Sequence, residues 1–177
     1  TLVKVQANNE IWYTSDEMKL VPTTPAALNA NIVSNVWDST TGKGVITFDA
    51  PVTTIGASAF EGCTTLRSII IPNSVKSIEE DAFAKCSALR DVSISASVTT
   101  ISTNPFTDCV NLASITVEEG NTVYDSRNNC NAIIETASNT LLVGCKSTII
   151  PEDVKKIGYS AFYGCINLKA ITIVIAF

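Results

Sequence analysis

The sequence predicts a repeat solenoid, a β-rich α/β fold. Its successive coils would form a parallel ladder of about six strands, with short helical turns on the opposite side. Two observations predict this fold: a 23-residue segment recurs, and the same apolar positions are kept in each copy. A coil that cannot bury its own apolar side is stabilised by stacking on its neighbours. The composition agrees, because 46% of the residues are hydrophobic and 16% are charged.

Four copies of the segment begin at Val52, Val75, Val98 and Val154. The first three follow one another at a spacing of 23 residues. The fourth begins 56 residues after the third, which is one period of 23 plus an insertion of 33. Each copy keeps seven apolar positions, and these should form columns along the stack. The columns are Val52/Val75/Val98/Val154, Ile55/Ile78/Ile101/Ile157, Phe60/Phe83/Phe106/Phe162, Cys63/Cys86/Cys109/Cys165, Leu66/Leu89/Leu112/Leu168, Ile69/Val92/Ile115/Ile171 and Ile71/Ile94/Val117/Ile173.

The end of each copy has two column positions one residue apart, as Ile69 and Ile71 in the stretch Leu66–Ile71, which is typical of a strand with one buried face. The small residues and phenylalanine around Ala59 and Phe60 predict a short helical turn on the opposite side. Extending the period in both directions predicts the whole ladder. Its strands are expected near residues 43–49, 66–72, 89–95, 112–118, 145–151 and 168–174.

Residues 1–42 lack the period and are expected to form an N-terminal cap, while residues 43–177 form the solenoid of the same structural domain. Within the cap, Glu10–Thr14 and Lys19–Val21 are predicted strands. A short helix is predicted between residues 23 and 30, entered through Pro25.

The insertion, at about residues 121–144, has a hairpin pattern with a four-residue loop at 136–139. Pairing Glu135 with Thr140 would place Cys130 opposite Cys145, where a disulfide is possible. Alternatively, Cys145 belongs to the ladder strand and turns away. Both alternatives stay open at the level of sequence.

The last residues, 171–177, are an apolar run without a polar cap. We expect either that the chain is truncated here or that this uncapped C-terminal end self-associates with another chain. The chain starts without a methionine or a signal-peptide pattern, so its first residues do not indicate a compartment. No apolar run approaches the roughly 20 residues needed to span a membrane.

The sequence favours binding over catalysis. It has no histidine, the usual general base and a common zinc ligand. The four cysteines at repeat spacing lack the close pairs of zinc sites and are expected to be a buried thiol column. Glu118, Glu119 and Asp125 could hold calcium, but a solvated turn explains them better. We therefore expect no enzyme, no cofactor and no catalytic or metal site.

The phrases IPNSVKSIEEDAFAKCSALRDVSI and VTTIGASAFEGCTTL resemble the BspA-like leucine-rich repeats of Bacteroides-type and treponemal surface proteins. The resemblance covers about residues 44–177. This sequence departs from the family pattern at three places. Glu79–Asp81 replaces a glycine-containing turn, Pro105 replaces the alanine before the phenylalanine, and Ser95 replaces the proline that ends the strand. The resemblance implies a leucine-rich repeat solenoid, export to the cell surface or the extracellular space, and adhesion to host or bacterial proteins such as fibronectin and fibrinogen.

The leading hypothesis is a non-catalytic protein-binding module that uses the exposed positions of the repeat strands. Its partner would be a matrix or plasma protein or another bacterial surface protein; the net charge of −5 speaks against nucleic acid. The alternatives are a structural spacer without a ligand and, less favoured, a glycan-active enzyme with paired carboxylates. The candidate partner-binding residues are Arg67, Ser68, Ile70, Arg90, Asp91, Ser93, Thr116, Lys169 and Thr172.

Overall fold

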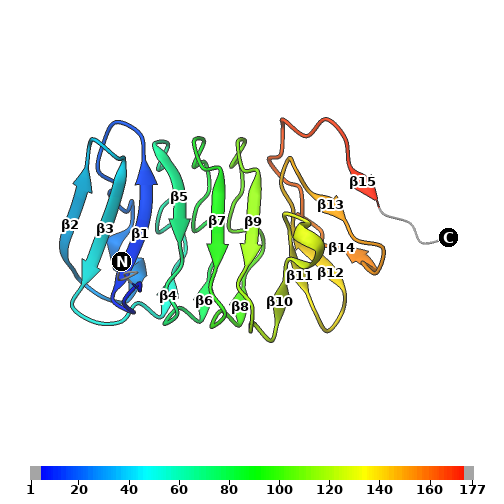
Figure 1. Ribbon diagram of the computed structural model, residues 1–177, viewed down its shortest axis with the longest axis horizontal. Helices are drawn as coiled ribbons and strands as arrows, with labels where there is room; N and C mark the ends of the chain where they lie inside the picture. The colour runs from blue at the N-terminus through cyan, green and yellow to red at the C-terminus, as the bar shows by residue number, and fades with distance from the viewer. Residues whose placement is uncertain (1–4, 174–177) are drawn as a thin grey trace.

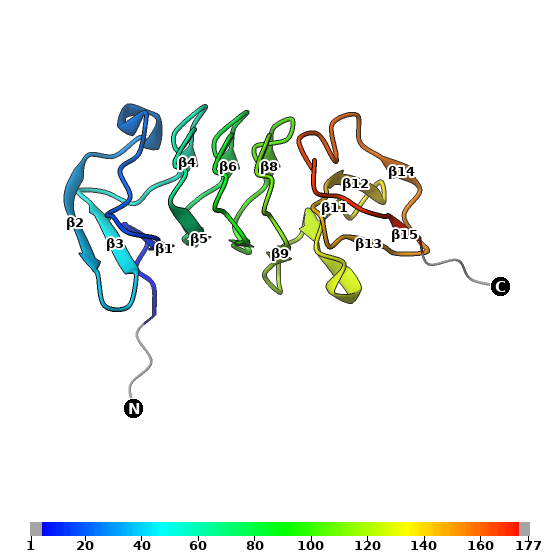
Figure 2. The same ribbon diagram turned by 90° about the horizontal axis from the view of Figure 1, so that it is seen from above.

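The computed structural model describes residues 5–173 and shows a row of stacked coils that begins with an N-terminal cap (Figures 1 and 2). Each regular coil gives one strand to a broad sheet and a two-residue strand to a narrow sheet on the other side. In chain order the elements are β1 (Glu10–Ser15), η1 (Pro25–Leu28), β2 (Ile32–Asp38), β3 (Lys43–Phe48), β4 (Thr54–Ile55), β5 (Leu66–Ile70), β6 (Ser77–Ile78), β7 (Asp91–Ile94), β8 (Thr100–Ile101), β9 (Ser114–Val117), β10 (Tyr124–Asp125), η2 (Arg127–Asn129), β11 (Ile133–Glu135), β12 (Thr140–Val143), β13 (Ile149–Ile150), β14 (Lys156–Ile157) and β15 (Thr172–Ile173).

The predicted solenoid and its 23-residue register are confirmed in the first three coils. Strands β5, β7 and β9 pair in parallel, with Ile69 beside Val92 and Val92 beside Ile115. Strands β4, β6 and β8 form the narrow sheet at the same spacing. The column side chains of these coils are buried, apart from the half-buried Ile101 and Val117. The core is therefore the continuous space between the two sheets.

The phenylalanine column shows how regularly the coils stack. Phe60, Phe83 and Phe106 are almost fully buried, and the ring centroids of successive pairs lie 5.3 Å apart. Stacked aromatic pairs at this separation add to the stabilisation from burial alone. The fourth ring, Phe162, is only half-buried and lies against Gly144, because the insertion separates its coil from the third.

The predicted helical turns around the phenylalanines are wrong. These segments are short hydrogen-bonded turns, with Cys63 N donating to Phe60 O at 3.1 Å. Left-handed backbone at Ser58 and Gly62 in one coil, and at Asp81 and Lys85 in the next, interrupts any helix. Three of these four residues are not glycine, the residue that usually adopts positive φ, so the sequence did not indicate left-handed backbone here.

The broad sheet, called sheet A below, has the strand order β2-β3-β1-β5-β7-β9. The prediction that the strand near 43–49 lies directly beside the strand near 66–72 is therefore wrong. Strand β1 lies between β3 and β5 and is antiparallel to both. The register itself was right, since Ile46 and Phe48 face the core. The repeat period determines which side chains point inward. It does not exclude that a strand from outside the repeats lies between two repeat strands.

The cap differs from its prediction in two further ways. The strand predicted at Lys19–Val21 is absent, and β2, at a place where no strand was predicted, forms the outer edge of sheet A. The helix predicted near Pro25 is the short 3-10 helix η1, whose Leu28 is fully buried. The division into residues 1–42 and 43–177 stays a prediction, although β3 pairs with both cap strands.

The insertion breaks the predicted six-strand ladder. Beyond β9, the position of the next strand is taken by the η2 segment, where Ser126 Oγ accepts a hydrogen bond from Val117 N at 2.9 Å. The ladder resumes in a separate sheet, in which β13 pairs in parallel with β15. The narrow side continues as the sheet β10-β11-β12-β14. The predicted strand near 168–174 is thus confirmed only at 172–173, and residue 174 lies outside the described residues.

The hairpin prediction is confirmed, since β11 and β12 pair with Glu135 beside Thr140. A bulge between Ile133 and Ile134 shifts the register, so that Cys130 no longer lies opposite Cys145. Both cysteines are free and buried, and Cys145 Sγ lies 3.3 Å from Asn131 O. The disulfide alternative is therefore wrong, and the physical reason is the bulge.

Candidate functional site

The outward face of sheet A carries a row of side chains that crosses all six strands. Strand register places Val36 beside Val45, Val45 beside Trp12, and Trp12 beside Ile70. The row continues through Ser93 to residue 116. With strands about 4.8 Å apart, the four apolar members span roughly 14 Å. A continuous apolar row on an exposed sheet face is unusual for a surface that meets only water.

This apolar row comes from the cap and the first coil together. Val36 and Ile70 are exposed, and Trp12 and Val45 are half-buried. The indole of Trp12 is oriented by a hydrogen bond from Nε1 to Glu10 Oε2 at 2.7 Å. The row therefore presents a fixed aromatic side chain with aliphatic side chains on both sides.

A shallow depression of about 490 Å³ lies over three members of this row, Val45, Trp12 and Ile70. Its polar groups are Lys43, Thr14 and Ser68, and the hydroxyl oxygens of Thr14 and Ser68 lie 2.6 Å apart. The complete lining is Trp12, Tyr13, Thr14, Lys43, Gly44, Val45, Ser68 and Ile70. None of these is a carboxylate, whereas a glycoside hydrolase needs a pair of them.

Packing beneath the depression holds β1 against β3. The Tyr13 ring crosses Gly44 so closely that an added Cβ at Gly44 would lie 2.0 Å from Tyr13 Cζ. The Tyr13 hydroxyl donates to Asn35 Oδ1 at 2.9 Å and accepts from Leu20 N at 3.3 Å. Burial raises the pKa of Tyr13, although the hydrogen bond from Leu20 N opposes this shift. The tyrosine thus ties β1 to β2 and to the segment that follows β1.

The structure brings together seven of the nine predicted site residues. These seven lie on or beside β5, β7 and β9 of sheet A, and they are Arg67, Ser68, Ile70, Arg90, Asp91, Ser93 and Thr116. Lys169 and Thr172 do not join them, because the insertion places their coil outside sheet A. Arg67 is paired with Asp16. None of the nine is tested by a bound partner, and their role stays a prediction.

The centre of the face was missed by sequence reasoning. Trp12 and Val45 line the depression, but neither was among the predicted site residues; the period places Val45 on the expected strand at 43–49, whereas Trp12 lies outside the period. The sequence did predict a strand at Glu10–Thr14, and in the structure β1 alternates in burial, with Trp12 on its less buried side. What the sequence lacked was any signal that this strand enters the sheet beside β5.

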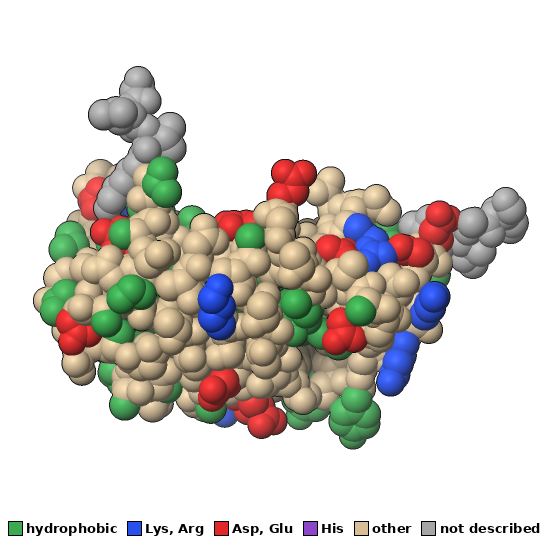
Figure 3. Space-filling view, turned by 90° about the horizontal axis from the view of Figure 1, so that it is seen from below, with side chains coloured by type: hydrophobic (Ala, Val, Ile, Leu, Met, Phe, Trp, Pro, Cys, Tyr) green, Lys and Arg blue, Asp and Glu red, His purple; other side chains and the backbone are tan. Residues whose placement is uncertain are grey.

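On the face shown in Figure 3, the charged side chains do not form a basic patch. On the side shown in Figure 3, lysine and arginine side chains are few and are interspersed with aspartate and glutamate. Within residues 5–173, no helix is long and apolar enough to cross a bilayer.

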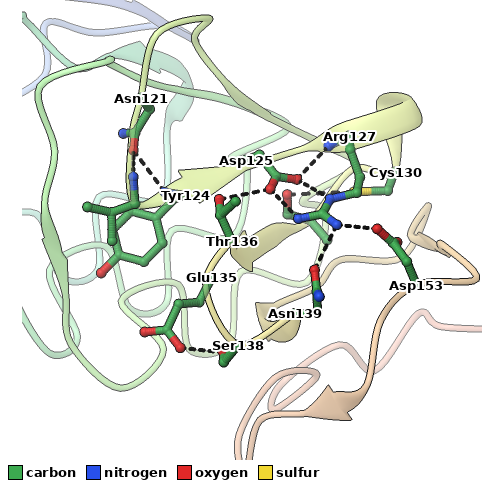
Figure 4. A network of polar contacts seen from close by, with 12 residues as sticks. Asn121, Tyr124, Asp125, Arg127, Cys130, Glu135, Thr136, Ser138, Asn139 and Asp153 are labelled. Atoms are coloured by element: carbon green, nitrogen blue, oxygen red, sulfur yellow. Dashed lines mark hydrogen bonds and ion pairs between the residues drawn. The ribbon is translucent and has the colours of Figure 1, made fainter.

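The insertion is held by a polar network around Arg127 (Figure 4). Arg127 Nε and Nη2 donate to the two carboxylate oxygens of Asp125 at 2.7 and 2.5 Å. Its Nη1 donates to Asn139 Oδ1 at 2.8 Å and also pairs with Asp153. Burial disfavours the charged form of Asp125, but hydrogen bonds from Arg127 and Thr136 outweigh it and lower its pKa. Arg127 therefore links the hairpin loop to Asp153, and Asp125 holds Arg127 in place.

The cysteine column is a set of thiols bonded to the backbone. Cys86 Sγ lies 3.1 Å from Phe60 O, and Cys109 Sγ lies 3.0 Å from Phe83 O, each reaching the preceding coil. Desolvation raises the pKa of Cys63 to about 11. A nucleophilic cysteine needs a lowered pKa, so the column is a packing device.

Comparison with known proteins adds a family model and solved structures. The model described as BspA type leucine rich repeat region matches residues 30–141 and 142–175. No curated protein matches the chain. The chain is similar to the crystal structure of the pneumococcal vaccine antigen PcpA, with 24% identity and a TM-score of 0.57 over 68% of this chain and 37% of that one.

It is also similar to a leucine-rich cell surface protein from Faecalibacterium prausnitzii A2-165, with 27% identity and a TM-score of 0.51. That match covers 68% of this chain and 39% of the other. The chain thus spans less than half the length of either structure, and the likeness to the pneumococcal antigen shows the fold alone.

Proposed function

Because the chain belongs to the BspA-type leucine-rich repeat family, we propose that it is a non-catalytic module that binds an extracellular protein through the outward face of sheet A. The observation that carries the proposal is the apolar row Val36, Val45, Trp12 and Ile70, with its depression. The module would bind its partner through a surface of complementary shape and polarity on this face, without any chemical step.

A protein partner fits the composition of the face. Interfaces between proteins combine an apolar centre, often with a tryptophan, and a polar rim that stays partly wet. Here Trp12 lies at the centre, and Lys43, Thr14 and Ser68 supply hydrogen-bonding groups at the rim. Arg90 and Asp91 extend the polar rim along the next coil.

The setting of the module is the cell surface or the extracellular space. Support comes from the relative in Faecalibacterium, which is described as a cell surface protein. The partner class would be a matrix or plasma protein or another bacterial surface protein. Adhesion is the role that such binding would serve.

The test is binding of the purified chain to a panel of matrix proteins, plasma proteins and bacterial surface proteins. The parent is compared with a Trp12→Ser/Ile70→Ser variant. The control is Val21→Ser, which also removes an exposed apolar side chain but lies beside Cys63, away from sheet A. Losing a central tryptophan at an interface costs about 2 kcal/mol or more, a roughly 30-fold weaker affinity.

Saturable binding that weakens in the double variant and persists in the control supports the proposal. If the parent, the double variant and the control bind with equal affinity, the binding site lies outside the outward face of sheet A. If none of the panel binds, the structural spacer replaces the binding module as the better account.

A further inference from the structure

The apolar row of sheet A runs straight across four neighbouring strands, β2, β3, β1 and β5 (Figure 1). Each strand contributes one residue in consecutive register, and these residues are Val36, Val45, Trp12 and Ile70. The register shifts of these pairings lie at the ends of β1 and β2, outside the row. Neighbouring members are therefore one strand spacing apart, about 4.8 Å. A partner that uses the whole row has to present an apolar side chain at nearly this interval.

An α-helix laid along the row meets this interval. Its apolar side chains return to the same face after each turn of about 5.4 Å, so the mismatch over the three steps from β2 to β5 sums to about 2 Å. An extended peptide presents side chains on one face about every 6.7 Å. Its mismatch over the same three steps is about 6 Å, which is more than one strand spacing. The row therefore favours a helix of about three turns over an extended segment.

The apolar row is one residue wide, which favours a helix over the sheet of a partner. On one side of the row the outward positions are Lys43, Thr14 and Ser68, which are neighbours in strand register. On the other side, Thr47 pairs with Glu10. Two sheets pack face to face through several rows of interdigitated side chains, whereas an amphipathic helix needs one apolar stripe.

Charges beside the row determine which helix would fit. Lys43 is exposed, and within residues 5–173 it belongs to none of the salt bridges. Its strand neighbour Asp38 accepts hydrogen bonds from Thr40 N at 2.8 Å and Thr41 Oγ1 at 2.9 Å, so that carboxylate is engaged in its own turn. Three strands along from Lys43, the exposed Asp91 continues the polar side. A complementary helix therefore carries an acidic residue over Lys43 and a basic residue about ten positions away, over Asp91.

A glycan fits the row less well than a helix. Val36, Val45 and Ile70 have aliphatic side chains without hydrogen-bonding groups, and Trp12 is the one aromatic member of the row. Sugar hydroxyls placed over the aliphatic members would lose water without gaining a partner, which costs free energy.

We propose that the protein partner docks on sheet A through an amphipathic α-helix of about three turns, laid across β2, β3, β1 and β5. Its apolar face covers the row, an acidic residue pairs with Lys43, and a basic residue pairs with Asp91. This inference rests on the proposed function, and it specifies which element of the partner is recognised.

The experiment selects peptides from two displayed libraries on the full 177-residue chain. Both libraries hold peptides of about 18 residues with the same composition; one has apolar residues at helical spacing, and the other alternates apolar and polar residues. Selected peptides are synthesised, and their affinity is measured by fluorescence anisotropy. We expect binders from the helical library alone. Their affinity should fall about 30-fold or more in the Trp12→Ser/Ile70→Ser variant.

A charge reversal tests the orientation of the helix. Lys43→Glu should weaken the selected peptides about three- to thirtyfold, because an attraction at the rim becomes a repulsion. The matched control is Lys76→Glu, which reverses another exposed lysine beside β6 of the narrow sheet and should leave the affinity unchanged. Circular dichroism checks that the variants are folded and that the bound peptide is helical.

Helical binders that depend on Trp12, Ile70 and Lys43 support the proposal. Binders from the alternating library that depend on Trp12 and Ile70 overturn it, as do equal effects of Lys43→Glu and Lys76→Glu. If a matrix or plasma protein binds through sheet A but neither library yields a binder, the helix is wrong and the binding module stands. A glycan that binds the parent and is lost in the double variant, with no peptide selected, also overturns the helix. A protein partner whose binding ignores Trp12 and Ile70 overturns the proposed function itself and the helix with it.

Discussion

Replacing Phe83 by alanine tests whether the stacked column stabilises the solenoid. Phe83 is fully buried between Phe60 and Phe106, with both ring centroids at 5.3 Å. Removing a buried phenylalanine costs about 3 to 5 kcal/mol, and the loss of two stacked contacts puts this site near the upper value. With a urea slope of about 2 kcal/mol per molar, the unfolding midpoint should fall by about 2.5 M.

The matched variant is Phe162→Ala, at the same repeat position in the last coil. Phe162 is half-buried and does not continue the stack, so its loss should cost about half as much or less. Urea unfolding followed by circular dichroism measures both proteins under one set of conditions. Equal losses for the two variants would refute the view that only the first three coils share a closed core.

Three further predictions concern other parts of the fold. Burial raises the pKa of the Cys63 and Cys165 thiols to about 11 from the ordinary 9.0, so the stability that they contribute is complete below pH 9 and is lost as pH rises through 11. Urea unfolding between pH 8 and 11 should show this fall, and a flat profile would contradict it. Arg127→Met should destabilise the hairpin by about 2 kcal/mol, because it leaves two carboxylates without their cation. Amide hydrogen exchange over residues 133–143 measures the effect, and unchanged protection would exclude it. Gly44→Ala should cost about 1 to 3 kcal/mol because its Cβ collides with the Tyr13 ring, which thermal melting detects; an unaltered melting temperature would count against this packing.

The core of the solenoid could be predicted from the sequence because the repeat makes each column visible several times. Phe60, Phe83 and Phe106 lie where the 23-residue period places them. Non-glycine residues with positive φ, such as Lys85, could not be anticipated, because the local strain is offset by the stack and leaves no compositional mark.

The candidate site was predicted only at its edge. The repeat pattern led to Ile70 and Ser68, which lie on β5. Trp12 joins them because β1 inserts between β3 and β5, a pairing that depends on contacts far apart in the sequence. The sequence predicts a strand at Glu10–Thr14, but the identity of its neighbours is decided by packing over the first coil.

The most direct test of the central claim is hydrogen exchange of the chain with and without a partner found in the binding panel. The account predicts protection on binding at the amides of β1, β3 and β5, around Trp12, with little change in the 121–144 insertion. Protection confined to the insertion or to the last coil, with β1 and β5 unchanged, would contradict the assignment of the outward face of sheet A as the binding surface.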